Sequence, residues 1–263
     1  MSVLFSGDFH ANKYGEMKFI NEESLRNKYH SLYDGINFHI ILGDGGFKRP
    51  LKKRKYDTNY DPLARRGFPV LCVIGNGDPF LGMKNVKETD IGIGETVFQI
   101  DEKPFVAYLK RGKAYTVDGI KFLVLGGALT PNRGKLVRNY SWWENEYWSE
   151  EEKRDVFKLL EKDSQFDLVI SHTGPYRVNK VLFNNYKYLQ EKLSDEVACL
   201  NDEIDKKIRF REWWCGHWHR DCTYYDETTG CVYEYLYKYT RLLNKTGNDI
   251  TLSCEWGLNL REQ

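Results

Sequence analysis

Five short segments of the chain combine glycine with side chains that bind divalent metal ions, and each follows an apolar run that is typical of a strand. Aspartate, asparagine and histidine are such ligands, because their oxygen and nitrogen atoms suit ions of intermediate hardness. Four of the six histidines fall in these segments. The segments are Gly7-Asp8-Phe9-His10, Gly43-Asp44, Gly75-Asn76-Gly77-Asp78, Ser171-His172 and Gly216-His217-Trp218-His219.

The spacing within these segments fits a site for two metal ions. Such a site needs ions about 3.5–4 Å apart, a carboxylate that bridges them, neutral imidazoles and an open position for water and substrate. Asp8 and His10 are two residues apart just beyond a strand, so both can reach one ion. His217 and His219 have the same spacing and could each bind a different ion.

Each motif taken alone has an ordinary explanation. A glycine-aspartate pair after a strand is usually a turn, and His172 or His217 alone would fit a hydrogen-bonded histidine at a strand end. His30 and His39 are assigned to this ordinary class. The order of all five motifs, each on a predicted strand end, is what favours a metal site.

The first half of the chain alternates strands with helical segments. Apolar runs predict strands at Val3–Phe5, Phe38–Leu42 and Val70–Ile74, and a helix follows the cap at Asn21, with Leu25, Tyr29 and Leu32 on one face. This order predicts a parallel sheet covered on both faces. Ligands bind where the strands of such sheets end, which is where the motifs stand.

The second half changes to short strands and longer helices. Four strands between residues 97 and 125 predict a meander that forms a second sheet or its edge. Ser149 and Glu152 form a capping box that opens a helix, and residues 187–208 predict one long helix or two helices broken near Ser194. Further strands are expected at Asp167–Ile170, Glu212–Cys215, Thr223–Asp226, Cys231–Tyr237 and Ile250–Trp256.

Composition limits the classes of partner. The chain has 263 residues and a net charge of +1 from 39 basic and 38 acidic residues, so we expect no membrane partner, and nucleic acid would need a local basic patch. Six scattered cysteines indicate buried free thiols in a reducing compartment. No apolar stretch reaches the roughly 18 residues of a membrane span. We expect a soluble cytoplasmic protein and, without a linker or repeat, one domain over residues 1–263.

The ordered set GDxH, GD, GN(x)D, SH and GHxH resembles the calcineurin-like metallophosphoesterase superfamily, in particular its small stand-alone bacterial and phage members. The resemblance implies that Asp8, His10 and His219 hold the first metal. It also implies that Asp44 bridges the two ions, and that Asn76, His172 and His217 hold the second.

The resemblance also implies a fold and a reaction. The fold is an α/β, four-layer α/β/β/α sandwich of two mixed sheets flanked by helices. The reaction is hydrolysis of a phosphate ester, in which a hydroxide held between two metals attacks phosphorus in line. The cofactors are two divalent ions, with manganese preferred and iron, zinc or nickel as alternatives.

The third motif departs from the family pattern. The family commonly has a histidine where this chain has Gly77, next to Asp78. That histidine assists the leaving group, and such assistance is typically worth about 10²–10⁴-fold. We list Asp78 with Asp44 and Asn76 as catalytic candidates, but expect an exposed, ionised Asp78 to be a poor acid. Phosphodiester cleavage is slightly favoured over monoester cleavage, and the alternative is a metal-binding interaction module without turnover.

Three arginines are candidates for substrate binding: Arg49, Arg133 and Arg138. A planar guanidinium suits a phosphate, although Arg133 and Arg138 could equally be solvated loop charges. The dense basic run from Lys48 to Lys55 could guide nucleic acid, but a flexible surface loop is the favoured interpretation. Trp213, Trp214 and Trp218 are expected to pack in the core beside the site.

Overall fold

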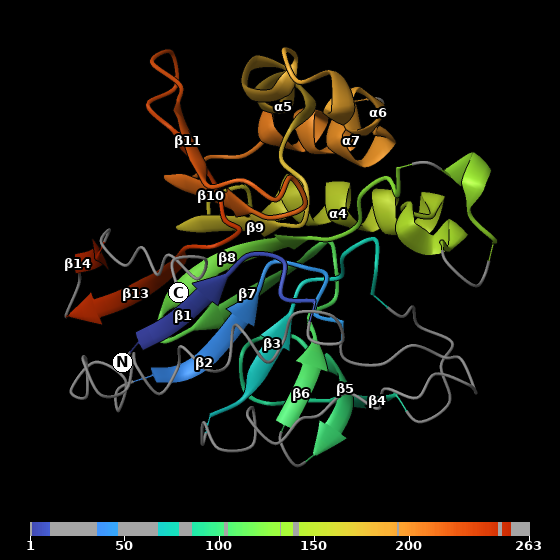
Figure 1. Ribbon diagram of the computed structural model, residues 1–263. Coiled ribbons are helices and arrows are strands. Elements are labelled where there is room, and N and C mark those ends of the chain that lie inside the picture. The colour runs from blue at the N-terminus through green and yellow to red at the C-terminus, as the bar shows by residue number, and fades with distance from the viewer. Residues whose placement is uncertain are drawn as a thin grey trace, which may run out of the picture.

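The computed structural model describes residues 2–10, 36–46, 68–78, 86–102, 105–131, 133–138, 142–193, 195–246 and 249–253. In these residues the chain forms two mixed β-sheets that pack face to face, with helices on the outer face of one of them (Figure 1). This confirms the predicted α/β sandwich. The helix predicted after Asn21 lies outside the described residues.

The first sheet has the order β14-β13-β1-β2-β3-β6-β5-β4. Its strands β1, β2 and β3 run parallel, as the apolar runs predicted, and β6 continues this parallel arrangement beside β3. β13 pairs antiparallel with β1 and was not predicted, because its Thr-Arg-Leu-Leu-Asn-Lys-Thr sequence is mostly polar. The strands are β1 (Ser2–Ser6), β2 (Ile36–Ile41), β3 (Val70–Cys72), β4 (Lys87–Thr89), β5 (Val97–Glu102), β6 (Phe105–Tyr108), β13 (Thr240–Thr246) and β14 (Asp249–Ser253).

The second sheet has the order β11-β12-β10-β9-β8-β7. The neighbours β8, β9, β10 and β12 run parallel, and the predicted hairpin of β11 and β12 is antiparallel. The strands are β7 (Lys113–Val117), β8 (Ile120–Leu125), β9 (Leu168–Ser171), β10 (Glu212–Cys215), β11 (Cys222–Tyr225) and β12 (Val232–Tyr235).

The predicted meander is divided between the two sheets, which corrects its assignment to one sheet or edge. β5 and β6 belong to the first sheet, where β6 pairs with β3. β7 and β8 belong to the second sheet, where they pair with each other. Apolar alternation predicted the strands but not their partners, because hydrogen bonds between distant strands decide which sheet a hairpin joins.

Helices α4 to α7 cover the second sheet (Figure 1). α4 (Glu150–Lys162) begins at the predicted capping box, where Ser149 accepts from the main-chain N of Glu152. Of the two alternatives predicted for residues 187–208, the structure has the second, with separate helices α6 (Gln190–Leu193) and α7 (Glu196–Asp205) and Asp195 as the cap of α7. α5 (Tyr176–Phe183) was not predicted. No helix in the described ranges is long and apolar enough to cross a membrane.

The core lies between the two sheets, with further apolar layers outside them. Alternation along β2 places Ile40 between the sheets and Ile41 on the outer face of the first. Across the interface, Phe5 meets Trp214 edge-to-face, with ring centroids 4.9 Å apart. Of the described cysteines, all free, Cys72 and Cys215 are buried as expected, whereas Cys199 is exposed.

Phe5→Ala should destabilise the fold by about 3–5 kcal/mol, because it removes a fully buried ring from between the sheets. Urea unfolding monitored by circular dichroism measures the change. Val137→Ala, at a side chain of 64% exposure, is the control and should change the free energy of unfolding by about 0.5 kcal/mol or less. Similar effects of the two substitutions would contradict this account of the core.

Candidate metal centre

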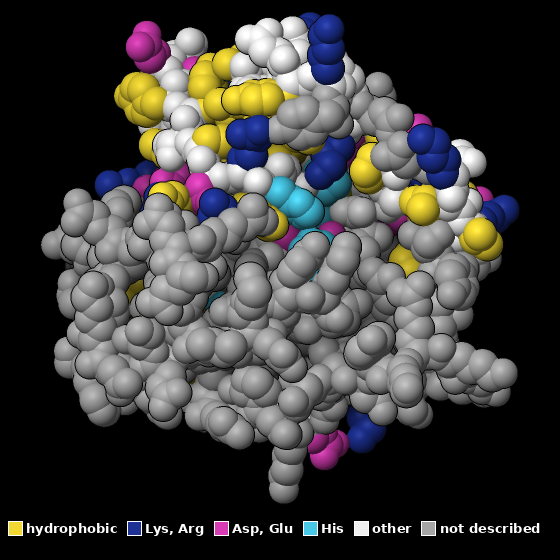
Figure 2. Space-filling model, in the orientation of Figure 1, with side chains coloured by type: hydrophobic (Ala, Val, Ile, Leu, Met, Phe, Trp, Pro, Cys, Tyr) yellow, Lys and Arg dark blue, Asp and Glu magenta, His cyan; other side chains and the backbone are white. Residues whose placement is uncertain are grey.

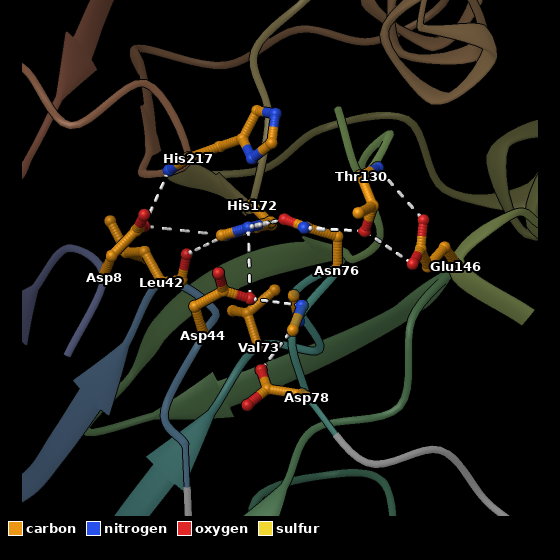
Figure 3. A network of polar contacts seen from close by, with 12 residues as sticks. Asp8, Leu42, Asp44, Val73, Asn76, Asp78, Thr130, Glu146, His172 and His217 are labelled. Atoms are coloured by element: carbon orange, nitrogen blue, oxygen red, sulfur yellow. Dashed lines mark hydrogen bonds and ion pairs between the residues drawn. The ribbon is translucent and has the colours of Figure 1, made fainter. Parts of the chain in front are cut away.

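The side chains predicted to bind metal converge where the strands of both sheets end, as Figure 3 shows for Asp8, Asp44, Asn76, His172 and His217. Asp8 and His10 follow β1, Asp44 follows β2, and Asn76 follows β3. The histidines of the second sheet complete the set, since His172 follows β9, and His217 and His219 follow β10. Segments up to 209 residues apart in sequence thus meet at hydrogen-bond distance.

The first group is Asp8, His10 and His219. Nε2 of His219 lies 2.8 Å from Oδ2 of Asp8, and Nε2 of His10 lies 3.8 Å from the same oxygen. The two Nε2 atoms are 3.2 Å apart. Burial opposes ionisation of Asp8, but the hydrogen bond from His219 and the nearby histidines hold its pKa well below the usual value. One ionised oxygen and two imidazole nitrogens therefore point at a common position.

The second group is centred on His172. Its Nδ1 lies 2.8 Å from the main-chain oxygen of Leu42, which can only accept, so Nδ1 carries a proton. In the neutral ring Nε2 then carries a lone pair, and it faces Oδ1 of Asn76 at 2.9 Å and Oδ1 of Asp44 at 3.5 Å. Three such acceptors repel one another unless a proton or a cation lies among them. Burial disfavours the protonated, charged ring, but the negative charges of Asp44 and Asp8 have the larger effect and raise the pKa of His172.

His217 has the properties of a metal ligand. It is buried, and its Nε2 has no hydrogen-bond partner among the residues that the structure describes. Its ring lies beside that of His172, with centroids 5.0 Å apart. Burial and the neighbouring Lys192 hold its pKa well below the usual value, so the ring is neutral and offers a lone pair. The donor set around His172 and His217 therefore fits a divalent metal.

Asp44 lies between the two groups. Its Oδ1 is 3.5 Å from Nε2 of His172, and its Oδ2 is 3.9 Å from Nε2 of His10. The main-chain N of Gly77 donates to Oδ1 at 2.6 Å and holds the carboxylate in place. One oxygen therefore faces each group, which is the placement that a bridging carboxylate needs.

Backbone strain is concentrated at this site. Five described residues other than glycine have a positive φ, and four of them are predicted ligands: His10, Asp44, His217 and His219. This conformation costs about 1–2 kcal/mol for a residue with a Cβ atom. Strain that the surrounding fold maintains at polar residues is typical of functional sites.

The glycines of the motifs allow segments from the two sheets to approach each other. A Cβ atom at Gly43, where φ is +94°, would lie 2.1 Å from Nδ1 of His172. One at Gly216 would lie 2.3 Å from Oδ1 of Asp8. Each glycine thus leaves the space that a ligand from the other sheet fills.

Asp78 differs from the prediction. It is fully buried, not exposed. Its carboxylate accepts from the main-chain N of Gly75 and of Gly46 and from the hydroxyl of Tyr108, at 2.8, 3.2 and 3.0 Å. Burial and the nearby Asp44 raise its pKa to about 6. Asp78 therefore connects the loop after β2 to the loop after β3. The sequence could not show these contacts, because Gly46 and Tyr108 are distant from Asp78 along the chain.

The arginines predicted to bind substrate have different surroundings. Arg133 pairs with Glu146 at 2.6 Å and packs against the ring of Trp142, whereas exposed Arg138 pairs with Glu144. Arg49 and the basic run around it lie outside the described residues. His39 forms a hydrogen bond with Ser6 at 2.8 Å, as an ordinary histidine would. Trp213, Trp214 and Trp218 are buried in the core, as expected.

Two neighbours of the site were missed at the sequence level. Nδ2 of Asn76 donates to the hydroxyl of Thr130 at 2.9 Å. Lys192 donates to the main-chain oxygen of His217 and lies near the ring of Trp218. Neither residue stands in a motif, since Thr130 lies in a loop and Lys192 is one polar position in a helical stretch.

The centre is open to one face of the molecule. Figure 2 shows histidine side chains at the surface near the middle of this face, with lysine or arginine side chains beside them. The side chains of His10 and His219 are 22% and 45% exposed, whereas those of His172 and Asp8 are almost fully buried. A solute can therefore reach the site from the side of the first group.

Comparison with known proteins points to one family. The model of the calcineurin-like phosphoesterases matches residues 1–221. No curated protein matches the chain. One crystal structure has a TM-score of 0.52 at 11% identity, with 95% of this chain and 97% of that chain covered, and shows a common fold.

Two further structures are similar at a lower level. GAP50, the anchor in the inner membrane complex of Plasmodium, has a TM-score of 0.47 at 11% identity, with 96% of this chain and 83% of that chain covered. The phosphopantetheinyl hydrolase of Mycobacterium tuberculosis has a TM-score of 0.47 at 16% identity, with 90% and 89% covered.

Gly216→Ala should weaken manganese binding about tenfold or more, because the new methyl group would displace the carboxylate of Asp8. Calorimetric titration of metal-free protein measures the affinity. Gly134→Ala is the matched control, since a Cβ atom there meets nothing within 4 Å. Equal affinities of the two variants would show that the close contact at Gly216 does not support metal binding.

Proposed function

The chain belongs to the calcineurin-like phosphoesterase family, and we propose that it hydrolyses phosphodiesters in preference to phosphomonoesters, using two divalent metal ions. The family implies a metal-dependent phosphoesterase. The choice of diester, the use of two ions and the preference for manganese are parts of the proposal.

The position of Asp44 is the observation that carries the proposal of two metals. Its carboxylate has one oxygen toward His172 and the other toward His10, at 3.5 and 3.9 Å. A site for a single ion would need only one of these groups. Oxygen and imidazole donors together suit manganese, iron, zinc or nickel.

The residues of the chain would divide the work as follows. Asp8, His10 and His219 would hold one ion, and Asn76, His172 and His217 the other, with Asp44 shared between them. When bound, such ions supply an activated water and neutralise charge that develops on the phosphate. Gly77 donates to Asp44 and Leu42 accepts from His172, so main-chain groups orient two of these side chains.

The preference for a diester rests on Gly77. Position 77 contributes no side chain, and a Cβ atom there would lie only 3.0 Å from Oδ1 of Asp44. Position 77 therefore lacks the cationic or proton-donating group that a histidine would place there. A monoester dianion carries more negative charge than a diester monoanion. Its hydrolysis is therefore slowed more when a group that would neutralise charge or donate a proton is missing.

Asp44→Asn should lower hydrolysis of bis(p-nitrophenyl) phosphate by a factor of about 10² or more, because the shared carboxylate becomes a neutral amide. Initial rates with added manganese measure this, with p-nitrophenyl phosphate as the matching monoester. Asp90→Asn is the control, since Asp90 is exposed and accepts from the main-chain N of Gly92.

Turnover of the monoester in excess of the diester would contradict the proposed substrate class. If neither ester were turned over while metal was bound, the alternative of a metal-binding interaction module would replace the enzyme.

A further inference from the structure

A chain of polar contacts leads away from Asn76 to a buried acid. The amide nitrogen of Asn76 lies 2.9 Å from the hydroxyl oxygen of Thr130, and that oxygen lies 2.6 Å from Oε1 of Glu146 (Figure 3). Glu146 closes the short helix η2 (Glu144–Glu146), far in sequence from the five motifs. The side chain of Glu146 is fully buried.

Glu146 is held as an acceptor on both of its oxygens. Oε1 also accepts from the main-chain N of Trp143 at 3.2 Å, and Oε2 accepts from the main-chain N of Thr130 at 3.0 Å. Arg133 supplies the compensating charge at 2.6 Å from Oε2. A buried carboxylate with a cation and main-chain donors around it is stable as an anion.

The ionised state of Glu146 decides the direction of every hydrogen bond in the chain. A carboxylate can only accept, so the single proton of the Thr130 hydroxyl must point to Glu146. The hydroxyl oxygen then presents a lone pair to Asn76. Only the NH₂ end of the Asn76 amide can meet that lone pair, and the amide oxygen must therefore face His172.

The opposite orientation of Asn76 would be harmful to the site. An amide nitrogen directed at Nε2 of His172 would bring protons to the position where the proposed second ion binds, and an amide cannot ligate a metal through its NH₂ group. The two ends of an asparagine differ little in shape, so packing alone selects between them weakly. The choice depends on hydrogen bonds.

We infer that Glu146 is a positioning residue which, through Thr130, fixes the amide of Asn76 with its oxygen toward the second metal. Arg133 then neutralises the charge of Glu146 and does not bind substrate. This inference rests on the proposed function, because it assigns a role in metal binding. Outer partners that orient metal ligands typically contribute 10–100-fold to metal affinity.

Other contacts of Arg133 agree with this role. A second nitrogen of its guanidinium donates to the hydroxyl of Tyr147 at 2.7 Å, and its plane packs near the ring of Trp142, 4.6 Å from the centroid. The side chain is 22% exposed. Neighbours on several sides therefore hold Arg133 next to Glu146.

The test is calorimetric titration of metal-free protein with Mn²⁺, comparing wild type with Glu146→Gln and Thr130→Val. Wild type should bind two ions. In Glu146→Gln the new amide can donate to the hydroxyl oxygen of Thr130. The hydroxyl proton can then point to Asn76 and hold its amide with the nitrogen toward His172. In both variants one of the two affinities should fall about 10–100-fold while the other stays within about twofold.

Three controls separate positioning from general damage. Glu144→Gln alters an exposed acid of the same short helix and should leave both affinities unchanged. Thr130→Ser keeps the hydroxyl and should restore wild-type affinity. In an Asn76→Asp background both ends of the side chain are oxygens, so Glu146→Gln should cause little further loss.

Each result has a defined meaning. Two unchanged affinities in Glu146→Gln and Thr130→Val, with normal circular dichroism, would overturn the inference and leave the proposed function standing. An equal fall in both affinities would also overturn it, because it would indicate general loosening of the site. A wild type that binds no manganese would remove the proposed function and the inference together.

Discussion

Two hydrogen bonds that cross between the sheets, both donated from the second sheet to the first, hold the metal centre together. The main-chain N of His217 donates to Asp8 at 2.7 Å, and Nδ1 of His172 donates to the main-chain oxygen of Leu42 at 2.8 Å. Each joins the end of a strand in one sheet to the end of a strand in the other. Together they set how closely the two sheets approach at the site and which way two of the histidines face.

Electrostatics explains why this junction needs so much support. Asp8, Asp44 and Asp78 bury their carboxylates within a small region, and an unpaired buried charge is costly. Main-chain N–H groups of three glycines and the nearby histidines compensate part of this charge. The remaining acceptors converge on positions that cations would fill. The centre thus has the donor set of a metal site.

The support extends beyond the groups that could touch metal. Tyr108 holds Asp78, which in turn joins two of the ligand loops. The loop after β8 and the short helix η2 supply Thr130 and Glu146 to Asn76. These residues belong to elements that carry no motif, yet they determine how the motif side chains point. Orientation, more than the presence of ligands, separates a working site from a cluster of polar groups.

Local patterns explain how much of the molecule could be predicted. Apolar runs predicted strands such as β1, β2, β3 and β10, because a strand buried on both faces has a continuous apolar sequence. The capping box at Ser149 located the start of α4, because a cap is formed by residues three apart. The short helix α5 and the polar strand β13, which lies between β14 and β1, were missed, because neighbours outside their own sequences stabilise them.

The same distinction applies to the site. The sequence by itself determined which side chains could bind metal, since each motif places polar groups directly after a buried strand. Only the tertiary structure decided that Asp78 is a buried tie, that Arg133 is the partner of Glu146, and that Asn76 is held through Thr130. Those contacts join residues 13 to 54 positions apart. No periodicity or spacing encodes them, because the partners meet only when separate segments of the chain fold against one another.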